Sequence, residues 1–136
     1  MNDDVVDAFT DFKLKRGDHH CRFFIYKIEN KKSIVIEKKG ELSKNYEDFV
    51  GELPENDCRY GIIDLDFETA DGRSTSKLVF ISWNPDTGPV RAKMLYSGSK
   101  EAMKAALNGV GIHINATDYA ELDFNDSILP VVRKFA

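Results

Sequence analysis

Cysteine is scarce in this chain, and no long apolar run interrupts it. The two cysteines, Cys21 and Cys58, are too few for a disulfide framework or, by themselves, for a zinc site. No segment approaches the roughly 20 consecutive apolar residues that a membrane-spanning helix needs. The start, Met1 to Asp4, lacks the basic and apolar regions of a signal peptide. We therefore expect a cytosolic protein with reduced thiols and no transmembrane segment.

Positive charge is also in short supply. The 19 Lys and Arg residues stand against 23 Asp and Glu residues, which leaves a formal net charge of −4. Because general nucleic-acid binders are usually basic, we do not expect a nucleic-acid partner. A glycine-rich phosphate loop is missing too, since Gly109-Val110-Gly111 follows a predicted helix instead of opening one. We expect no cofactor and no metal.

The chain does contain enough apolar material for one core. Hydrophobic residues make up 42% of the 136 residues, which fits a single domain over residues 1–136. Helical periodicity predicts helices over residues 3–14, 46–53, 89–108 and 117–122. Aromatic and β-branched residues predict strands over residues 22–28, 33–37, 58–67, 77–83 and 113–115. Strands flanked by helices indicate an α/β fold of the α+β type, with a mixed sheet between helix layers.

Two prolines mark expected helix boundaries. Pro89 suits the first position of the long helix, where its missing N–H costs nothing, and Gly109 suits the C-cap. Pro130 falls inside an amphipathic tail over residues 124–135. Because a proline deep in a helix costs about 3 kcal/mol or more, Pro130 either breaks the tail or stands in the first turn of a new helix.

Several motifs resemble the ADF/cofilin family in their order and spacing. They are Leu53 to Tyr60, Phe80 to Thr87 and Lys93 to Ala102, and Ala8 to Leu14 is similar to the first helix of the family. Gly109-Val110 and Ala116-Thr117-Asp118 continue the match, so the resemblance covers almost the whole chain. It implies the ADF-homology fold, a central mixed, mostly antiparallel five-stranded sheet sandwiched between helices.

The resemblance also implies a function. Members of the family are non-enzymatic proteins that bind actin monomers, preferentially in the ADP state, and bind filaments cooperatively. A ligand that prefers one filament twist shifts the filament toward it, and this promotes severing and depolymerisation. The implied partner is monomeric and filamentous actin, and we expect a monomer that works in the cytoplasm on the actin cytoskeleton.

The family motif places the actin-monomer surface on the long helix. Arg91, Lys93 and Met94 match its positions, and Lys100, Glu101 and Lys104 extend it, with Asn2 and Asp3 from the N-terminus. The competing interpretation is an ordinary solvated helix face with Met94 in the core. For filament contacts the candidates are Lys77, Arg133 and Lys134. Lys77 could instead be a lysine that protects the edge of a strand.

Three alternatives stay open. Beside a severing and depolymerising factor, the second hypothesis is a mainly monomer-binding factor with weak severing. It is supported by the start of the chain, which lacks the serine whose phosphorylation inhibits relatives, and by Pro130 in the tail. A remote third is a small hydrolase or metal enzyme that uses Cys58 or the histidines. Phosphoinositide head groups could also contact Lys31, Lys32, Lys38, Lys39, Arg91, Lys93 and Lys100.

Overall fold

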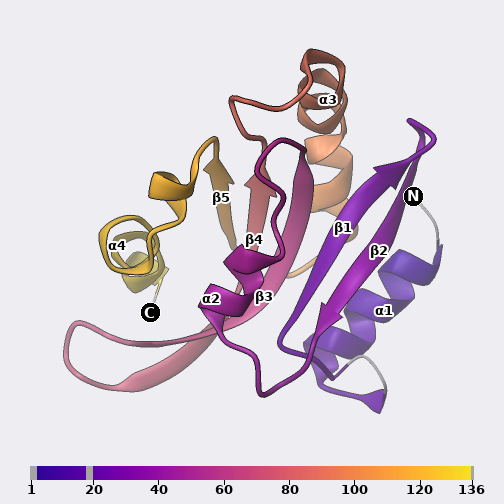
Figure 1. Cartoon of the computed structure of the whole chain (residues 1–136). Coiled ribbons are helices and arrows are strands. Elements are labelled where there is room, and N and C mark those ends of the chain that lie inside the picture. Colours follow the sequence, from indigo (N-terminus) through magenta and orange to yellow (C-terminus); the bar gives the residue numbers. More distant parts are fainter. Residues whose placement is uncertain (1–2, 18–19, 136) are drawn as a thin grey trace.

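The computed structural model describes residues 3–17 and 20–135 (Figure 1). In chain order, the first half contains α1 (Asp3–Leu14), β1 (Phe23–Glu29), β2 (Ser33–Gly40), α2 (Tyr46–Gly51) and β3 (Arg59–Glu68). The second half contains β4 (Ser74–Trp83), α3 (Val90–Ala106), β5 (Ile112–Ala116), η2 (Tyr119–Leu122), η3 (Phe124–Ile128), α4 (Leu129–Val132) and η4 (Arg133–Phe135). Over these ranges, no helix is both long and apolar enough to cross a membrane.

The strands form one five-stranded sheet in the order β2-β1-β3-β4-β5. Three neighbouring pairs are antiparallel, and β4 and β5 are parallel, with α3 as the connection between them. A parallel pair needs such a crossover, whereas the antiparallel pairs β1–β2 and β3–β4 are joined by short turns. The predicted mixed, mostly antiparallel five-stranded sheet is confirmed.

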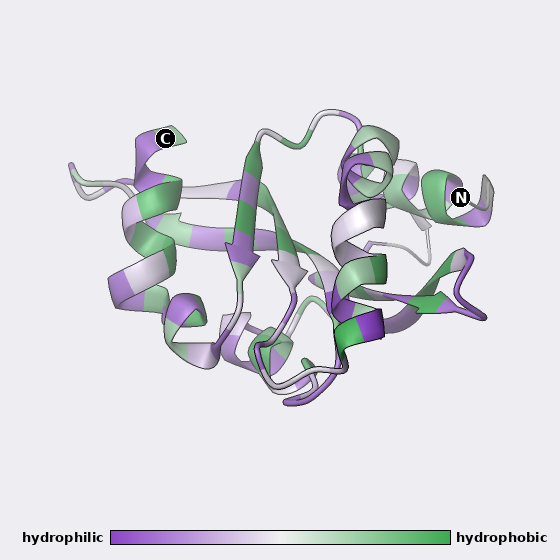
Figure 2. Cartoon of the chain, turned by 90° about the horizontal axis from the view of Figure 1, so that it is seen from above, coloured by the Kyte–Doolittle hydropathy of each residue, from purple (hydrophilic) through white to green (hydrophobic). Residues whose placement is uncertain are grey.

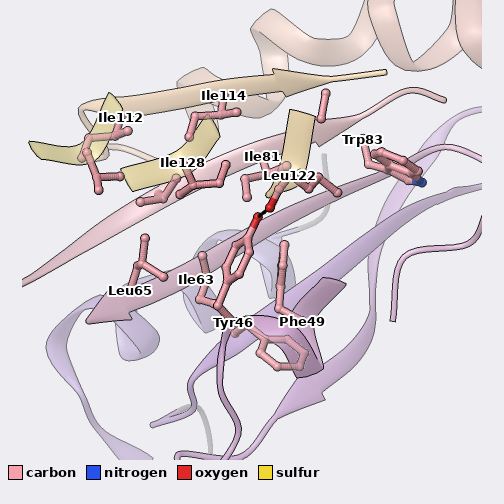
Figure 3. Packing of buried hydrophobic residues seen from close by; sticks show 14 of the residues in the cluster. Tyr46, Phe49, Ile63, Leu65, Ile81, Trp83, Ile112, Ile114, Leu122 and Ile128 are labelled. Atoms are coloured by element: carbon pink, nitrogen blue, oxygen red, sulfur yellow. Dashed lines mark hydrogen bonds between the residues drawn. The ribbon is translucent and has the colours of Figure 1, made fainter. Parts of the chain in front are cut away.

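Helices cover both faces of this sheet, so side chains that alternate along a strand enter two different cores. On one face, α2, η3 and α4 pack against Ile25, Ile63 and Ile81. Figure 3 shows this side, where the Tyr46 hydroxyl of α2 donates a 2.6 Å hydrogen bond to the Leu122 carbonyl. On the other face, α1 and α3 pack against residues that include Phe24, Tyr60, Ile62 and Phe80. The layers are visible in Figure 2, with the C-terminal turns on one side of the sheet and α1 and α3 on the other.

The boundaries of α3 differ slightly from the prediction. Pro89 is the N-cap and not the first helical residue, because its ψ of 137° is extended while its carbonyl already accepts from Lys93 N at 3.0 Å. At the other end, Leu107 is the C-cap. Gly109 follows two residues later with a φ of +95°, which suits glycine. It therefore turns the chain toward β5 after the helix has ended.

Strands β2 and β4 each begin or end three residues beyond their predicted bounds, because their partner strands extend them. The register between β1 and β2 shifts between Ile25 and Tyr26, which leaves Glu37 as the extra residue of a bulge. Because the bulge interrupts the alternation of apolar and polar residues, the sequence pattern does not predict that the strand continues to Gly40. Strand β4 begins at Ser74, since the polar Ser74–Ser76 segment pairs with Asp66–Glu68 of β3.

The tail remains helical despite Pro130. It passes through a π-helical turn in η3, where Ile128 N donates to Asp123 O at 3.0 Å, and α4 then begins with Pro130 in its first turn. A proline there sacrifices no intrahelical hydrogen bond. Of the two options for Pro130, the new helix is confirmed.

Candidate functional site

The first turn of α3 exposes an unusual amount of apolar surface. Val90 is 72% exposed and Met94 70%, more than any other large apolar side chain among the described residues. They are four residues apart and therefore neighbours on one helix face, with exposed Arg91 beside them. We call Val90, Arg91 and Met94 the α3 ridge. The interpretation that put Met94 in the core is wrong, because the buried face of α3 is formed by Tyr96 and Met103.

Hydrogen bonds on the buried side fix the position of the ridge. The Tyr60 hydroxyl donates to the Tyr96 carbonyl, and the Tyr96 hydroxyl accepts from Ile28 N at 2.8 Å. The Asn84 side-chain amide donates to the Lys93 carbonyl at 3.1 Å and to Ser97 Oγ at 2.9 Å. Since these partners come from β1, β3 and the end of β4, the sheet holds α3 from several strands. The ridge is thus presented on a rigid support.

The structure divides the predicted α3 residues into two groups. Lys93 and Lys100 line a groove of 520 Å³ beside Met94, on the side of α3 that faces the ends of β4 and β5. Their ammonium groups donate to the Asp86 carbonyl at 3.3 Å and to Asn115 Oδ1 at 3.2 Å. These short-range contacts orient both cations next to the ridge.

Glu101 and Lys104 lie further along α3 and pair with each other at 3.6 Å. They line a different hollow, together with His113. Partial burial and the positive charge of Lys104 lower the pKa of His113, which favours its neutral form. Of the six α3 residues predicted, two belong to the ridge, Lys93 and Lys100 flank it, and Glu101 and Lys104 form a separate patch. Asp3 opens α1, on the same face of the sheet as α3, whereas Asn2 lies outside the described residues.

The three filament candidates gather on the other face of the sheet. Lys77 is exposed on β4 directly opposite Leu65, whose side chain faces the core under α4. Arg133 Nε donates to the Glu68 carbonyl at 2.9 Å, which ties η4 to the end of β3, and Lys134 beside it is exposed. The structure therefore brings Lys77, Arg133 and Lys134 to one end of the β3–β4 hairpin.

Cys58 has the environment of a core residue. Its side chain is fully buried, and its Sγ donates to Asn84 Oδ1 at 3.5 Å. Burial, with a smaller contribution from Asp57, raises the pKa of the thiol to about 11, so the nucleophilic thiolate is not populated near neutral pH. In the part of the chain that the structure describes, no three His, Cys, Asp or Glu side chains are grouped as a metal site. The buried, protonated thiol of Cys58 argues against a cysteine-dependent enzyme.

Sequence reasoning missed a second groove beside the ridge. It measures 920 Å³ and separates the first half of α3 from the β1–β2 hairpin, with Arg91 and Met94 on one wall and Ile28 and Lys31 on the other. Its two walls are about 60 residues apart in the sequence, so no local pattern could join them. The sequence predicts only the two strands over residues 22–28 and 33–37, and Lys31 lies in the connection between them.

Comparisons with known proteins show the family to which the chain belongs. The family model for cofilin/tropomyosin-type actin-binding proteins matches residues 1–128. Actin-depolymerizing factor 2 of Oryza sativa subsp. japonica is 46% identical over 121 residues, which is 88% of this chain and 81% of the relative. Cofilin of Yarrowia lipolytica is 42% identical over 138 residues, covering 100% of this chain and 87% of the relative. The crystal structure of Streptomyces griseoflavus cofilin matches with a TM-score of 0.82 and 32% identity, over 96% of this chain and 95% of that one. The chain therefore belongs to the cofilin/ADF family of actin-binding proteins.

Proposed function

We propose that this protein binds monomeric actin, preferentially with ADP bound, through the α3 ridge and the flanking Lys93 and Lys100. The observation that carries the proposal is the exposure of Val90 and Met94, at 72% and 70%, on a helix that is otherwise firmly anchored. Exposed apolar side chains beside cations form the kind of patch that becomes a hot spot when a partner excludes water. Methionine adapts its shape to such a partner.

The proposed activity is depolymerisation and severing of filaments by binding alone, with no catalytic residue. The supporting observation is the second set of cations, Lys77, Arg133 and Lys134, on the opposite face of the sheet from α3. A protein with contact surfaces on both faces can touch two filament subunits at once. If it binds the twisted filament more tightly, it shifts the filament toward that state. The helical tail around Pro130 keeps this second surface intact, which favours this activity over monomer sequestration with weak severing.

The test is removal of two cations, Arg91 in the ridge and Lys93 beside it. The variant Arg91→Ala/Lys93→Ala should bind ADP-actin monomers roughly 10-fold more weakly or worse, because charged contacts at a partly desolvated interface are lost. A fluorescence titration of labelled actin measures the affinity. The matched control is Lys15→Ala/Lys44→Ala, which removes two exposed lysines that line neither groove beside α3. Equal affinities of the two double variants would refute the α3 surface.

We further propose that the protein is a cytoplasmic monomer and that phosphoinositide head groups compete with actin for the cations around α3. Support comes from Arg91, Lys93 and Lys100, which line the two grooves that meet at Met94. Anionic head groups attract such clusters of cations. Cosedimentation with phosphoinositide-containing vesicles tests the competition. If the two ligands compete, added monomeric actin releases the protein from the vesicles.

A further inference from the structure

The groove between α3 and the β1–β2 hairpin is continuous with the α3 ridge, because Arg91 and Met94 belong to both. Its volume of 920 Å³ lies within the range of about 300 to 1,000 Å³ that is typical of binding pockets. Leu95 and Ile28 add apolar surface on its two walls. A partner that covers the ridge therefore also reaches the mouth of this groove.

The two walls are held in place before any partner binds. Ile28 N, at the hairpin wall, donates to the Tyr96 hydroxyl at 2.8 Å, and Tyr96 is buried on the inner face of α3. The backbone carbonyl of Tyr96 accepts from the buried Tyr60 hydroxyl. Because β1, β3 and α3 are linked through one tyrosine, the groove does not need to form on binding, which lowers the entropic cost of association.

The cations around the groove differ in whether their charge is compensated. The Arg59 guanidinium pairs with carboxylate oxygens of Glu37 and Asp57, each at an N–O distance of 2.9 Å. Lys27 Nζ lies 3.7 Å from Glu29 Oε2. Lys31 and Arg91, by contrast, form no ion pair with any residue that the structure describes. Two uncompensated cations thus stand on opposite walls of a groove with an apolar lining. An occupant that matches them presents a carboxylate next to apolar side chains.

The backbone at Lys31 adds an independent observation. Asn30 and Lys31 have φ values of +53° and +62°, and Lys32 N donates to the Glu29 carbonyl at 3.1 Å. Two central residues with positive φ are those of a type I′ turn, where Asn followed by Gly is the favoured pair. Asparagine tolerates this conformation, but lysine gains nothing from it and loses stability relative to glycine. A strained residue whose side chain lines a groove points to a role in binding.

We propose that the actin contact extends from the α3 ridge into this groove and that Lys31 on the β1–β2 hairpin contacts an acidic group of actin directly. The proposal rests on the proposed binding of monomeric actin to α3. It adds a second element, remote in sequence, to the interface. It also explains why a lysine occupies a turn position that suits glycine.

The decisive variant is Lys31→Gly, because strain relief and loss of a contact act in opposite directions. It should leave Tm unchanged or raise it by up to roughly 4 °C, since glycine fits the positive φ. At the same time its affinity for ADP-actin monomers should fall roughly 3- to 10-fold, as one charged contact is lost. Thermal unfolding and the fluorescence titration of labelled actin measure the two effects on the same preparation.

The control is Lys32→Ala, which removes the neighbouring lysine that does not line the groove, and its affinity should stay within 2-fold of wild type. If Lys31→Gly binds actin like wild type while Arg91→Ala/Lys93→Ala is weakened, the groove contact is overturned and the α3 surface stands. If Lys31→Gly weakens only binding to phosphoinositide vesicles, the groove serves lipid and the inference is wrong. If wild-type protein does not bind actin, both proposals fail together.

Discussion

Four buried tyrosines differ in what their hydroxyl groups contact. The hydroxyls of Tyr46 and Tyr60 each donate to a backbone carbonyl, and that of Tyr96 accepts from Ile28 N. Tyr26 is fully buried on the α1 and α3 side, yet its hydroxyl has no partner within residues 3–17 and 20–135. Burial raises the pKa of Tyr26, so the group stays protonated and unionised. A buried polar group without a partner costs about 1 to 3 kcal/mol of stability.

Removal of the hydroxyl should therefore have opposite effects at two tyrosines. We expect Tyr26→Phe to leave the free energy of unfolding unchanged or raise it by about 1 kcal/mol, because no hydrogen bond is lost. We expect Tyr46→Phe to lower it by about 1 to 3 kcal/mol, since the buried Leu122 carbonyl loses its donor. Urea denaturation followed by fluorescence measures both values. Equal destabilisation by the two substitutions would mean that Tyr26 has a partner that we have not identified.

Single elements were predictable where a local pattern decides them. The apolar spacing in α1 and the proline and glycine around α3 locate those helices to within a few residues, because helix periodicity and capping are local. The bulge at Glu37 and the polar start of β4 depend on pairing with a neighbouring strand, so no local sequence pattern predicts them. The exposure of Met94 was likewise not predictable from apolar spacing, which favours burial. Only the family motif indicated it.

Pro130 provides a test of the tail as an element. Because it stands in the first turn of α4, the substitution Pro130→Ala restores no missing hydrogen bond and should change the free energy of unfolding by less than about 1 kcal/mol. If Pro130 disrupted a helix, its replacement would instead raise the free energy of unfolding by about 3 kcal/mol. Val132→Ala is the comparison, since it removes fully buried methyl groups from the same helix and should cost about 2 kcal/mol. Urea denaturation of the three proteins separates these outcomes.

At the scale of the whole molecule, the sheet separates two basic surfaces. The α3 ridge and its flanking lysines lie on the face that α1 also covers, and Lys77 and Lys134 lie on the face covered by α4. Sequence motifs could nominate residues of both surfaces, but only the sheet topology shows that they are on opposite sides. A single layer of strands between them keeps both surfaces rigid relative to each other. This arrangement supports the proposed filament activity, because contact surfaces on both faces can touch two subunits at once.

The two surfaces should therefore be separable by mutation. We expect Lys77→Ala/Lys134→Ala to reduce cosedimentation with filaments by roughly 5-fold or more, because exposed charge contacts to the second subunit are lost. Its affinity for ADP-actin monomers should stay within 2-fold of wild type, since neither lysine lines a groove beside α3. Arg91→Ala/Lys93→Ala should weaken both kinds of binding, because the proposed function assigns the same α3 contact to a monomer and to the first subunit of a filament. If Lys77→Ala/Lys134→Ala instead pellets with filaments like wild type and severs them at the same rate in filament imaging, the α4 face takes no part in the activity. Filament remodelling would then have to arise from the α3 surface alone.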